Sequence, residues 1–146
     1  MDINKFKNIF EDVELSGDKI IIKSNLREAI IFIVENYSYQ MLKDITAVEK
    51  RDGNVELTYH LYSVEDEEDL LISIVVKDEA ESIIDIFKSA IADENEIYDM
   101  FGIKFTGNNS LKRLYMPQSW EGFPLRKDYV ESDERLAWDD NNDIQA

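Results

Sequence analysis

Residues 55–62 read VELTYHLY, and the alternation of apolar and polar side chains in this stretch predicts a β-strand with one buried face. Just before it, Asp52-Gly53 is a strong signal for a tight hairpin, which pairs this strand with one at 42–50. After it, the run LLISIVV at 70–76 is apolar enough to be a central strand. We therefore expect a three-stranded meander with helices over its apolar face. The buried positions on the middle strand are Val55, Leu57, Tyr59 and Leu61.

The amino-terminal part of the chain supplies a further strand and two helices. Apolar residues at helical spacing indicate a short helix at 3–13, and the isoleucine run within 18–23 is short enough for a strand. Asn25 with Glu28 resembles a capping box, which begins a longer helix that extends to Tyr37. The apolar face of that helix consists of Leu26, Ala29, Ile30, Ile33, Val34 and Tyr37.

Two more helices are predicted before Gly102. Asp78 and Glu81 can cap the first, and Asp93 and Glu96 can cap the second, which Gly102 stops. Their apolar stripes are Ile83, Ile84, Phe87 and Ile91, followed by Ile97, Met100 and Phe101. The expected fold class is α+β, a two-layer domain with a mixed, roughly four-stranded sheet covered by helices.

Regular periodicity ends at Gly102. Residues 103–130 contain both prolines of the chain and show neither the helical nor the strand period. A structureless stretch this long is uncommon inside a compact domain, and its aromatic residues are too many for ordinary disorder. We therefore divide the chain into an α+β domain at 1–102 and, at 103–146, an extended partner-binding arm with an acidic tail.

The charge of the chain is large and unevenly distributed. Its 146 residues carry a net charge of −16, which disfavours binding to nucleic acid or anionic lipid. Residues 103–130 hold five basic side chains against two acidic ones, whereas 131–146 hold one against six. A locally basic, aromatic segment thus lies between two acidic ones.

Several classes of protein are excluded. The chain has no cysteine, which removes disulfides, iron–sulfur ligation and thiol chemistry. It has no run of about 18 apolar residues that would predict a transmembrane helix. The first residues, MDINKFKNIF, do not read as a signal peptide.

No residue pattern predicts catalysis or a metal site. His60 is the only histidine, whereas a zinc site usually needs three or four nitrogen or sulfur ligands. Acidic neighbours such as Glu94 and Asp99 are expected by chance among 32 acidic residues, and acid–base catalysis needs a positioned, tuned pair. Phosphate-binding glycine loops and the G-x-S-x-G motif are absent. We expect no catalytic residue, no cofactor and no metal in this chain.

Two stretches resemble a known family. ENEIYDMFGIKF at 94–105 and LKRLYMPQSWEGFPLRKDY at 111–129 resemble the signature of the C-type subunit of complex I, a hydrophilic component of its peripheral arm, and of its relatives in energy-converting membrane-bound hydrogenases. The resemblance covers about a quarter of the chain. On the helix, the motif falls on Glu94, Glu96, Asp99, Met100, Phe101 and Gly102.

The chain departs from this signature at three positions. Asn95 replaces an arginine, Asn108 stands near a family histidine, and Phe123 replaces the histidine before Pro124. These departures argue against any role that needs those charges. The short segment after Tyr129 fits a compact relative from a hydrogenase or an archaeal-type dehydrogenase.

The resemblance implies an α+β subunit without a redox centre. Such a subunit docks on the homologue of the nickel–iron hydrogenase large subunit, at the cytoplasmic periphery of a membrane-bound complex, and its arm embraces that neighbour. Both an NADH-quinone oxidoreductase and an energy-converting hydrogenase remain open as the parent complex.

The arm contains the residues expected at the partner interface, because tryptophan, tyrosine and arginine are favoured interface anchors. These residues are Arg113, Trp120, Phe123, Pro124, Leu125, Arg126, Lys127, Asp128 and Tyr129. One alternative is a free-standing acidic adaptor that captures an unrelated partner through 103–130. Another is that the loop folds back on its own sheet.

Overall fold

The computed structural model describes residues 1–130, and the predicted acidic tail at 131–146 lies outside the described residues. The helices are α1 (Ile3–Ile9), α2 (Leu26–Asn36) and α3 (Ala90–Phe101). The strands are β1 (Val13–Ser16), β2 (Lys19–Ile22), β3 (Met41–Glu49), β4 (Val55–Ser63), β5 (Glu68–Val76), β6 (Glu79–Glu81) and β7 (Lys104–Thr106). The predicted α+β class is confirmed. Within the described part, no helix is long and apolar enough to cross a bilayer.

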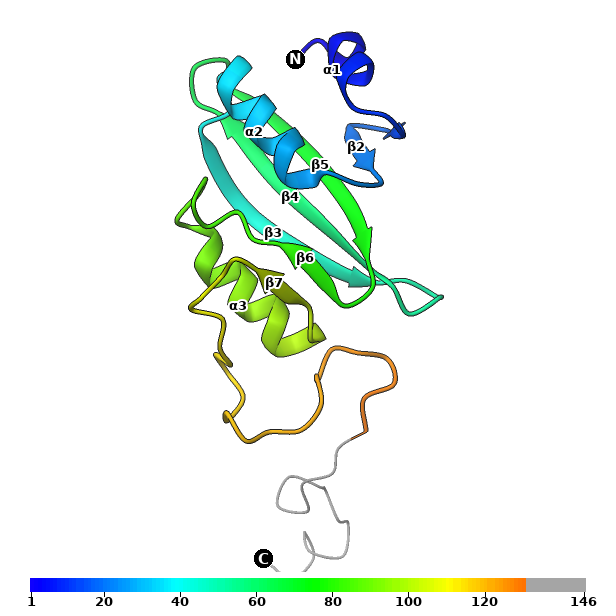
Figure 1. Cartoon of the computed structure of the whole chain (residues 1–146), viewed down its shortest axis with the longest axis vertical. Coiled ribbons are helices and arrows are strands. Elements are labelled where there is room, and N and C mark those ends of the chain that lie inside the picture. Colours follow the sequence, from blue (N-terminus) through cyan, green and yellow to red (C-terminus); the bar gives the residue numbers. More distant parts are fainter. Residues whose placement is uncertain (131–146) are drawn as a thin grey trace, which may run out of the picture.

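Five strands form a mixed sheet in the order β1-β2-β5-β4-β3, as Figure 1 shows. The meander of β3, β4 and β5 is antiparallel and confirms the strand prediction, while β2 joins β5 in parallel. The predicted hairpin turn joins β3 to β4, and Gly53 within it has a φ of 85°, which glycine adopts without strain.

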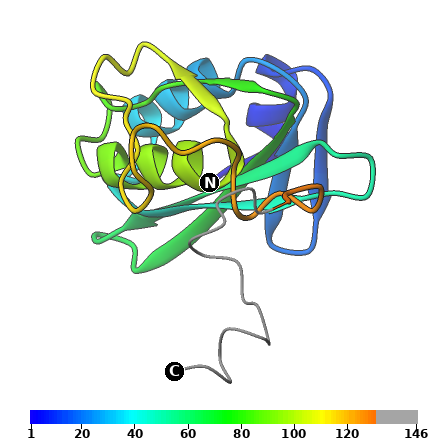
Figure 2. The same cartoon turned by 90° about the horizontal axis from the view of Figure 1, so that it is seen from below.

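The sheet has one covered face. The alternation predicted for β4 is present, because Val55, Leu57, Tyr59 and Leu61 are fully buried while the side chains between them remain partly exposed. α2, α3 and the β6–β7 pair lie over the buried face in Figure 1, and Figure 2 shows the molecule from below with these elements on one side of the sheet. This arrangement is the two-layer architecture expected from the sequence.

α2 matches its predicted stripe but not its predicted cap. Leu26, Ala29, Ile30 and Ile33 are buried against the sheet. Asn25 has a left-handed backbone with a φ of 59°, and its side chain makes no capping hydrogen bond. The capping-box interpretation was therefore wrong, because that motif needs an extended N-cap residue.

The region from Asp78 to Gly102 contains one helix instead of two. Residues 79–81 form β6, which pairs in parallel with β7, and α3 begins only at Ala90. The helix predicted around Ile83–Ile91 was wrong because the residues expected to begin it, 79–81, pair with β7, a strand that follows α3 in the chain. Local periodicity does not report such a distant pairing.

The amino-terminal helix is shorter than predicted. It ends at Ile9, and Asp12 turns the chain with a φ of 58° so that Val13 begins β1. β1 forms a hairpin with β2 and raises the sheet from the predicted four strands to five. β1 is mostly exposed, so its sequence lacks the alternation that would have indicated a strand.

The core continues past Gly102. Ile103 is fully buried and Phe105 is 2% exposed. The part of the predicted arm that could leave the domain without exposing these core side chains therefore begins no earlier than Gly107.

We predict that Phe105→Ala lowers the free energy of unfolding by about 3–5 kcal/mol, the usual cost of truncating a core phenylalanine. Lys104→Ala, at the exposed preceding position, is the control and should change it by less than about 0.5 kcal/mol. Urea denaturation followed by circular dichroism measures both. Equally small changes would show that β7 contributes little to the core.

Candidate partner interface

Residues 107–130, which we call the strap, follow β7 and contain all nine predicted interface residues. The strap passes the carboxy-terminal end of α3 and reaches the turn between β3 and β4 (Figures 1 and 2). It has almost no regular secondary structure, yet it makes many hydrogen bonds to the domain.

Asp99, on α3, is the main attachment point of the strap. Its carboxylate is fully buried and lies 3.1 Å from a guanidinium nitrogen of Arg113. Its second oxygen accepts hydrogen bonds from three consecutive backbone N–H groups at 3.2, 2.7 and 3.1 Å. These donors belong to Leu114, Tyr115 and Met116. A single side chain thus fixes four successive residues of the strap.

Arg113 links Asp99 to a second part of the strap. Its side chain is only 6% exposed, and its guanidinium also donates to the carbonyls of Trp120 at 2.9 Å and Gly122 at 2.7 Å. The same group lies over the ring of Phe123, 4.7 Å from the ring centroid. Arg113 was predicted to contact a partner, but the structure satisfies its guanidinium within the chain.

The strap also caps α3. The last four carbonyls of a helix have no partner inside the helix and need donors from elsewhere. Here all four receive one, and two of the donors are cationic, which suits the negative end of the helix dipole. The donor–acceptor pairs are Gly102 N–H to Tyr98, Arg113 to Asp99, Leu125 N–H to Met100 and Arg126 Nε to Phe101.

Gly102 allows the strap to approach closely. Its φ of 76° is in the left-handed region, and a Cβ placed on it would lie 2.6 Å from the ring of Phe123. Any other residue at this position would therefore need both strained backbone and displacement of Phe123.

Arg126 binds the far end of the strap to the meander. Its guanidinium donates to the carbonyl of Gly53 at 2.8 Å and lies 3.4 Å from the carboxylate of Glu49. Glu49 also accepts the backbone N–H of Lys127 at 2.7 Å. Arg126, like Arg113, is engaged inside the chain.

Glu94 holds the beginning of the strap without a cation. It is fully buried and accepts hydrogen bonds from Ser82 Oγ at 2.8 Å, Ile83 N–H at 2.9 Å and Asn108 Nδ2 at 2.9 Å. Burial raises the pKa of Glu94, while these three hydrogen bonds act in the opposite direction. The residue therefore joins the segment after β6 to the segment after β7.

The three residues that depart from the family signature all make contacts within the chain. Asn108 binds Glu94, and Phe123 packs between Gly102 and Arg113. Asn95 is 2% exposed and accepts the backbone N–H of Lys112 at 3.3 Å. Each of these contacts is made without a charged side chain at that position.

The remaining predicted residues differ in exposure. Met100, Phe101, Trp120, Phe123, Pro124, Arg126 and Tyr129 are half-buried, whereas Glu96, Leu125, Lys127 and Asp128 are exposed. Trp120 Nε1 donates to the hydroxyl of Tyr129 at 3.2 Å, so these two predicted anchors contact each other. Leu114 and Tyr115, 43% and 70% exposed, are apolar candidates that the sequence reasoning missed.

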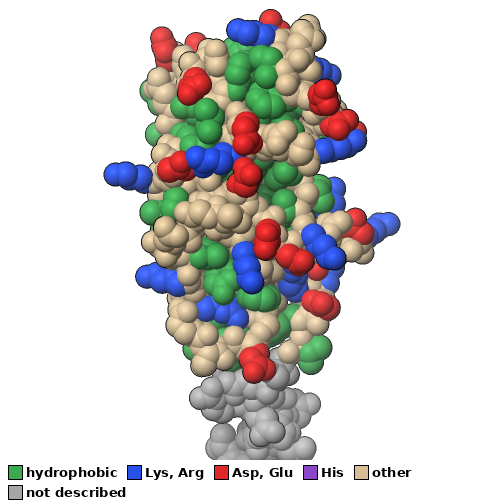
Figure 3. Space-filling model, in the orientation of Figure 1, with side chains coloured by type: hydrophobic (Ala, Val, Ile, Leu, Met, Phe, Trp, Pro, Cys, Tyr) green, Lys and Arg blue, Asp and Glu red, His purple; other side chains and the backbone are tan. Residues whose placement is uncertain are grey.

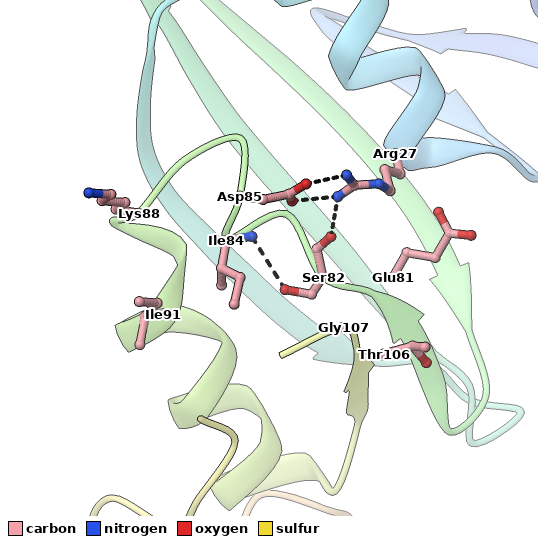
Figure 4. Close-up of a pocket in the computed structure, with 9 residues that line it drawn as sticks. All are labelled: Arg27, Glu81, Ser82, Ile84, Asp85, Lys88, Ile91, Thr106 and Gly107. Carbon is pink, nitrogen blue, oxygen red and sulfur yellow. Dashed lines mark hydrogen bonds and ion pairs between the residues drawn. The ribbon is translucent and has the colours of Figure 1, made fainter. Parts of the chain in front are cut away.

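A separate hollow of about 640 Å³ lies between the start of α2 and the start of α3, as Figure 4 shows. Its most conspicuous charge is Arg27, which donates to Asp85 and to the carbonyl of Ser82. The paired guanidinium lowers the pKa of Asp85. Asp85 thus neutralises the charge of Arg27.

His60 has an ordinary structural environment. Its Nε2 lies 2.7 Å from the Asp69 carboxylate, which also accepts from Lys43 at 2.7 Å. Among residues 1–130, no group of three or more potential metal-binding side chains is present.

Comparison with known proteins gives one family. The family model described as "Respiratory-chain NADH dehydrogenase, 30 Kd subunit" matches residues 20–135, well beyond the motif stretches. The chain is 40% identical over 104 residues to the NADH-quinone oxidoreductase C/D subunit of Acidiphilium cryptum, covering 63% of this chain and 18% of that protein. It is 31% identical over 126 residues to the same protein of Phocaeicola vulgatus, covering 84% and 23%. It thus spans about a fifth of the length of these relatives.

A solved structure has a similar fold. With a TM-score of 0.73 and 20% identity, the chain resembles part of the membrane-bound sulfane sulfur reductase, an archaeal respiratory membrane complex. The similarity covers 88% of this chain and 83% of the matching chain of that complex. At this level of identity, it supports the fold alone.

We predict that Asp99→Ala lowers the free energy of unfolding by about 3–5 kcal/mol, because it leaves the buried Arg113 guanidinium without its counter-ion. Glu96→Ala is the matched control, since Glu96 is an exposed acidic residue on the same helix, and it should cost less than about 0.5 kcal/mol. Urea denaturation measures both. Similar values for the two variants would contradict the assigned role of Asp99.

We also predict a pH effect from Glu94. Its folded-state pKa is raised above the ordinary value of 4.5, so the folded protein retains this proton to a higher pH than the unfolded chain does. The resulting stabilisation of the folded state is fully present below pH 4.5 and is lost as the pH rises through the folded-state pKa. Glu94→Gln cannot ionise and lacks this loss. Its stability relative to wild type should therefore increase as the pH is raised from about 4 to 7.

Denaturation curves across this pH range test the effect, with Glu94→Gln compared with Glu35→Gln at an exposed position on α2. A difference between wild type and Glu94→Gln that is independent of pH would show that Glu94 has the same pKa in both states.

Proposed function

The chain belongs to the 30 kDa subunit family of respiratory-chain NADH dehydrogenases, and on this premise we propose that it is a non-catalytic assembly subunit that docks on a D-type subunit. The resemblance to the C-type subunit of complex I is thereby confirmed. The parent assembly is a complex I-type or related membrane respiratory complex.

The proposed partner rests on the name of the relatives, which joins two subunits. Their name, C/D, places a C-type and a D-type subunit in one polypeptide, and the present chain matches about a fifth of it. Two modules in one polypeptide meet at high effective concentration, which favours pairs of modules that work in contact. The family resemblance identifies the D-type subunit with the homologue of the hydrogenase large subunit.

The strap has a composition suited to contact with a protein. Arg113 and Arg126 have internal acidic partners, and Lys112 and Lys127 remain exposed beside apolar side chains. The strap therefore avoids the strong acidity of the whole chain. Figure 3 shows that the face of the molecule in that view carries hydrophobic, basic and acidic side chains interspersed, without a large area of one charge.

We propose that the redox groups of the parent complex are held by other subunits. The chain has no cysteine and therefore offers no thiolate to an iron–sulfur cluster, and its single histidine is paired with Asp69. Following the family resemblance, we place the chain at the cytoplasmic periphery of the membrane complex.

The test is co-expression of the full chain with the D-type subunit of the same organism. We predict a stable complex with one copy of each subunit. Its binding free energy should weaken by no more than about 2 kcal/mol between low and moderate salt. Exposed ion pairs supply about 0–1 kcal/mol each and are screened, whereas apolar contacts are not.

Pull-down followed by titration at two salt concentrations measures this prediction. Complete loss of binding at moderate salt would show that electrostatic attraction dominates. Failure of the D-type subunit to bind, with capture of an unrelated protein, would favour the free-standing adaptor.

A further inference from the structure

The strap presents two adjacent apolar side chains to solvent. Tyr115 is 70% exposed and Leu114 is 43% exposed, although both belong to a segment attached to a buried carboxylate. Their backbone is held inward while their side chains remain outside. By contrast, Trp120 is half-buried and its indole N–H is bonded to Tyr129.

The backbone of this turn is fixed before any partner arrives. The N–H groups of residues 114–116 converge on one carboxylate oxygen of Asp99, and Arg113 holds the other oxygen. A fixed backbone reduces the conformational entropy lost on association. Tyrosine adds a large contact area with few rotatable bonds, which is why it is enriched among residues that dominate binding energy.

Charge indicates the character of the surface that faces the turn. Once Arg113 and Arg126 are paired internally, the strap keeps Lys112 and Lys127 against Glu121 and Asp128, and is close to neutral. The whole chain has a net charge of −16. The strap therefore lacks the net negative charge of the whole chain, and a carboxylate on the rim of the partner's surface would complement Lys112.

We propose that Leu114 and Tyr115 are the main anchors for the D-type subunit, inserted into an apolar pocket with a carboxylate within reach of Lys112. This inference rests on the proposed function and changes the residues expected to dominate it. Trp120 and Arg126 shape the strap from within, and Asp99 and Arg113 act as positioning residues for the turn.

The experiment measures the affinity of the separately produced D-type subunit for the full chain and for Leu114→Ala, Tyr115→Ala and the double variant. The double variant should bind at least about tenfold more weakly, as expected for dominant anchors. Val64→Ala, at a 60% exposed apolar position just after β4, is the control and should bind within about twofold of wild type. Thermal unfolding of each free variant verifies that the fold is intact.

The outcomes separate the two proposals. If the wild-type chain does not bind the D-type subunit, the proposed function fails and this inference fails with it. If wild type binds and the folded double variant binds equally well, the anchor assignment is overturned while the proposed function stands. A photocrosslinking residue at position 115 should also crosslink to the D-type subunit, whereas one at position 64 should not; the reverse result overturns the assignment.

Discussion

The course of the strap depends on one constraint, the need of the carboxy-terminal end of α3 for hydrogen-bond donors. Four carbonyls at this end need hydrogen-bond donors, and three of the four donors come from residues more than ten positions further along the chain. Because buried carbonyls are costly to leave unpaired, the helix and the strap stabilise each other. A segment without its own secondary structure is thereby given a defined course.

Two buried carboxylates on α3 extend this constraint in different ways. Asp99 has a cationic partner in Arg113, so its charge is compensated inside the protein. Glu94 has only neutral donors, and desolvation of its charge is opposed by hydrogen bonds from both sides of the β6–β7 pair. Through Glu94, α3 therefore connects the β6–β7 pair to the beginning of the strap. Through Asp99, the same helix fixes the backbone of residues 114–116.

Sequence patterns predicted the parts of the fold that local periodicity determines. The meander and the apolar stripe of α2 are of this kind, since alternation and helical spacing directly reflect a buried face. The helix predicted around Ile83–Ile91 was wrong because β6 is fixed by pairing with residues beyond α3. At the interface, composition pointed to Trp120 and Arg126. The sequence does not reveal that Arg126 binds backbone carbonyls, or that Asp99 holds the backbone of Tyr115 while its side chain remains exposed.

The position of the strap in the chain has a consequence for biosynthesis. Protein chains are made from the amino terminus, and residues of α3 leave the ribosome before the residues that cap its end. The core strand β7 and the strap follow, so the surface built from residues 107–130 is completed only after the sheet and α3 are available to receive it. A partner that recognises this surface would thus select finished molecules, and recruitment to a multisubunit assembly would be delayed until the fold is complete.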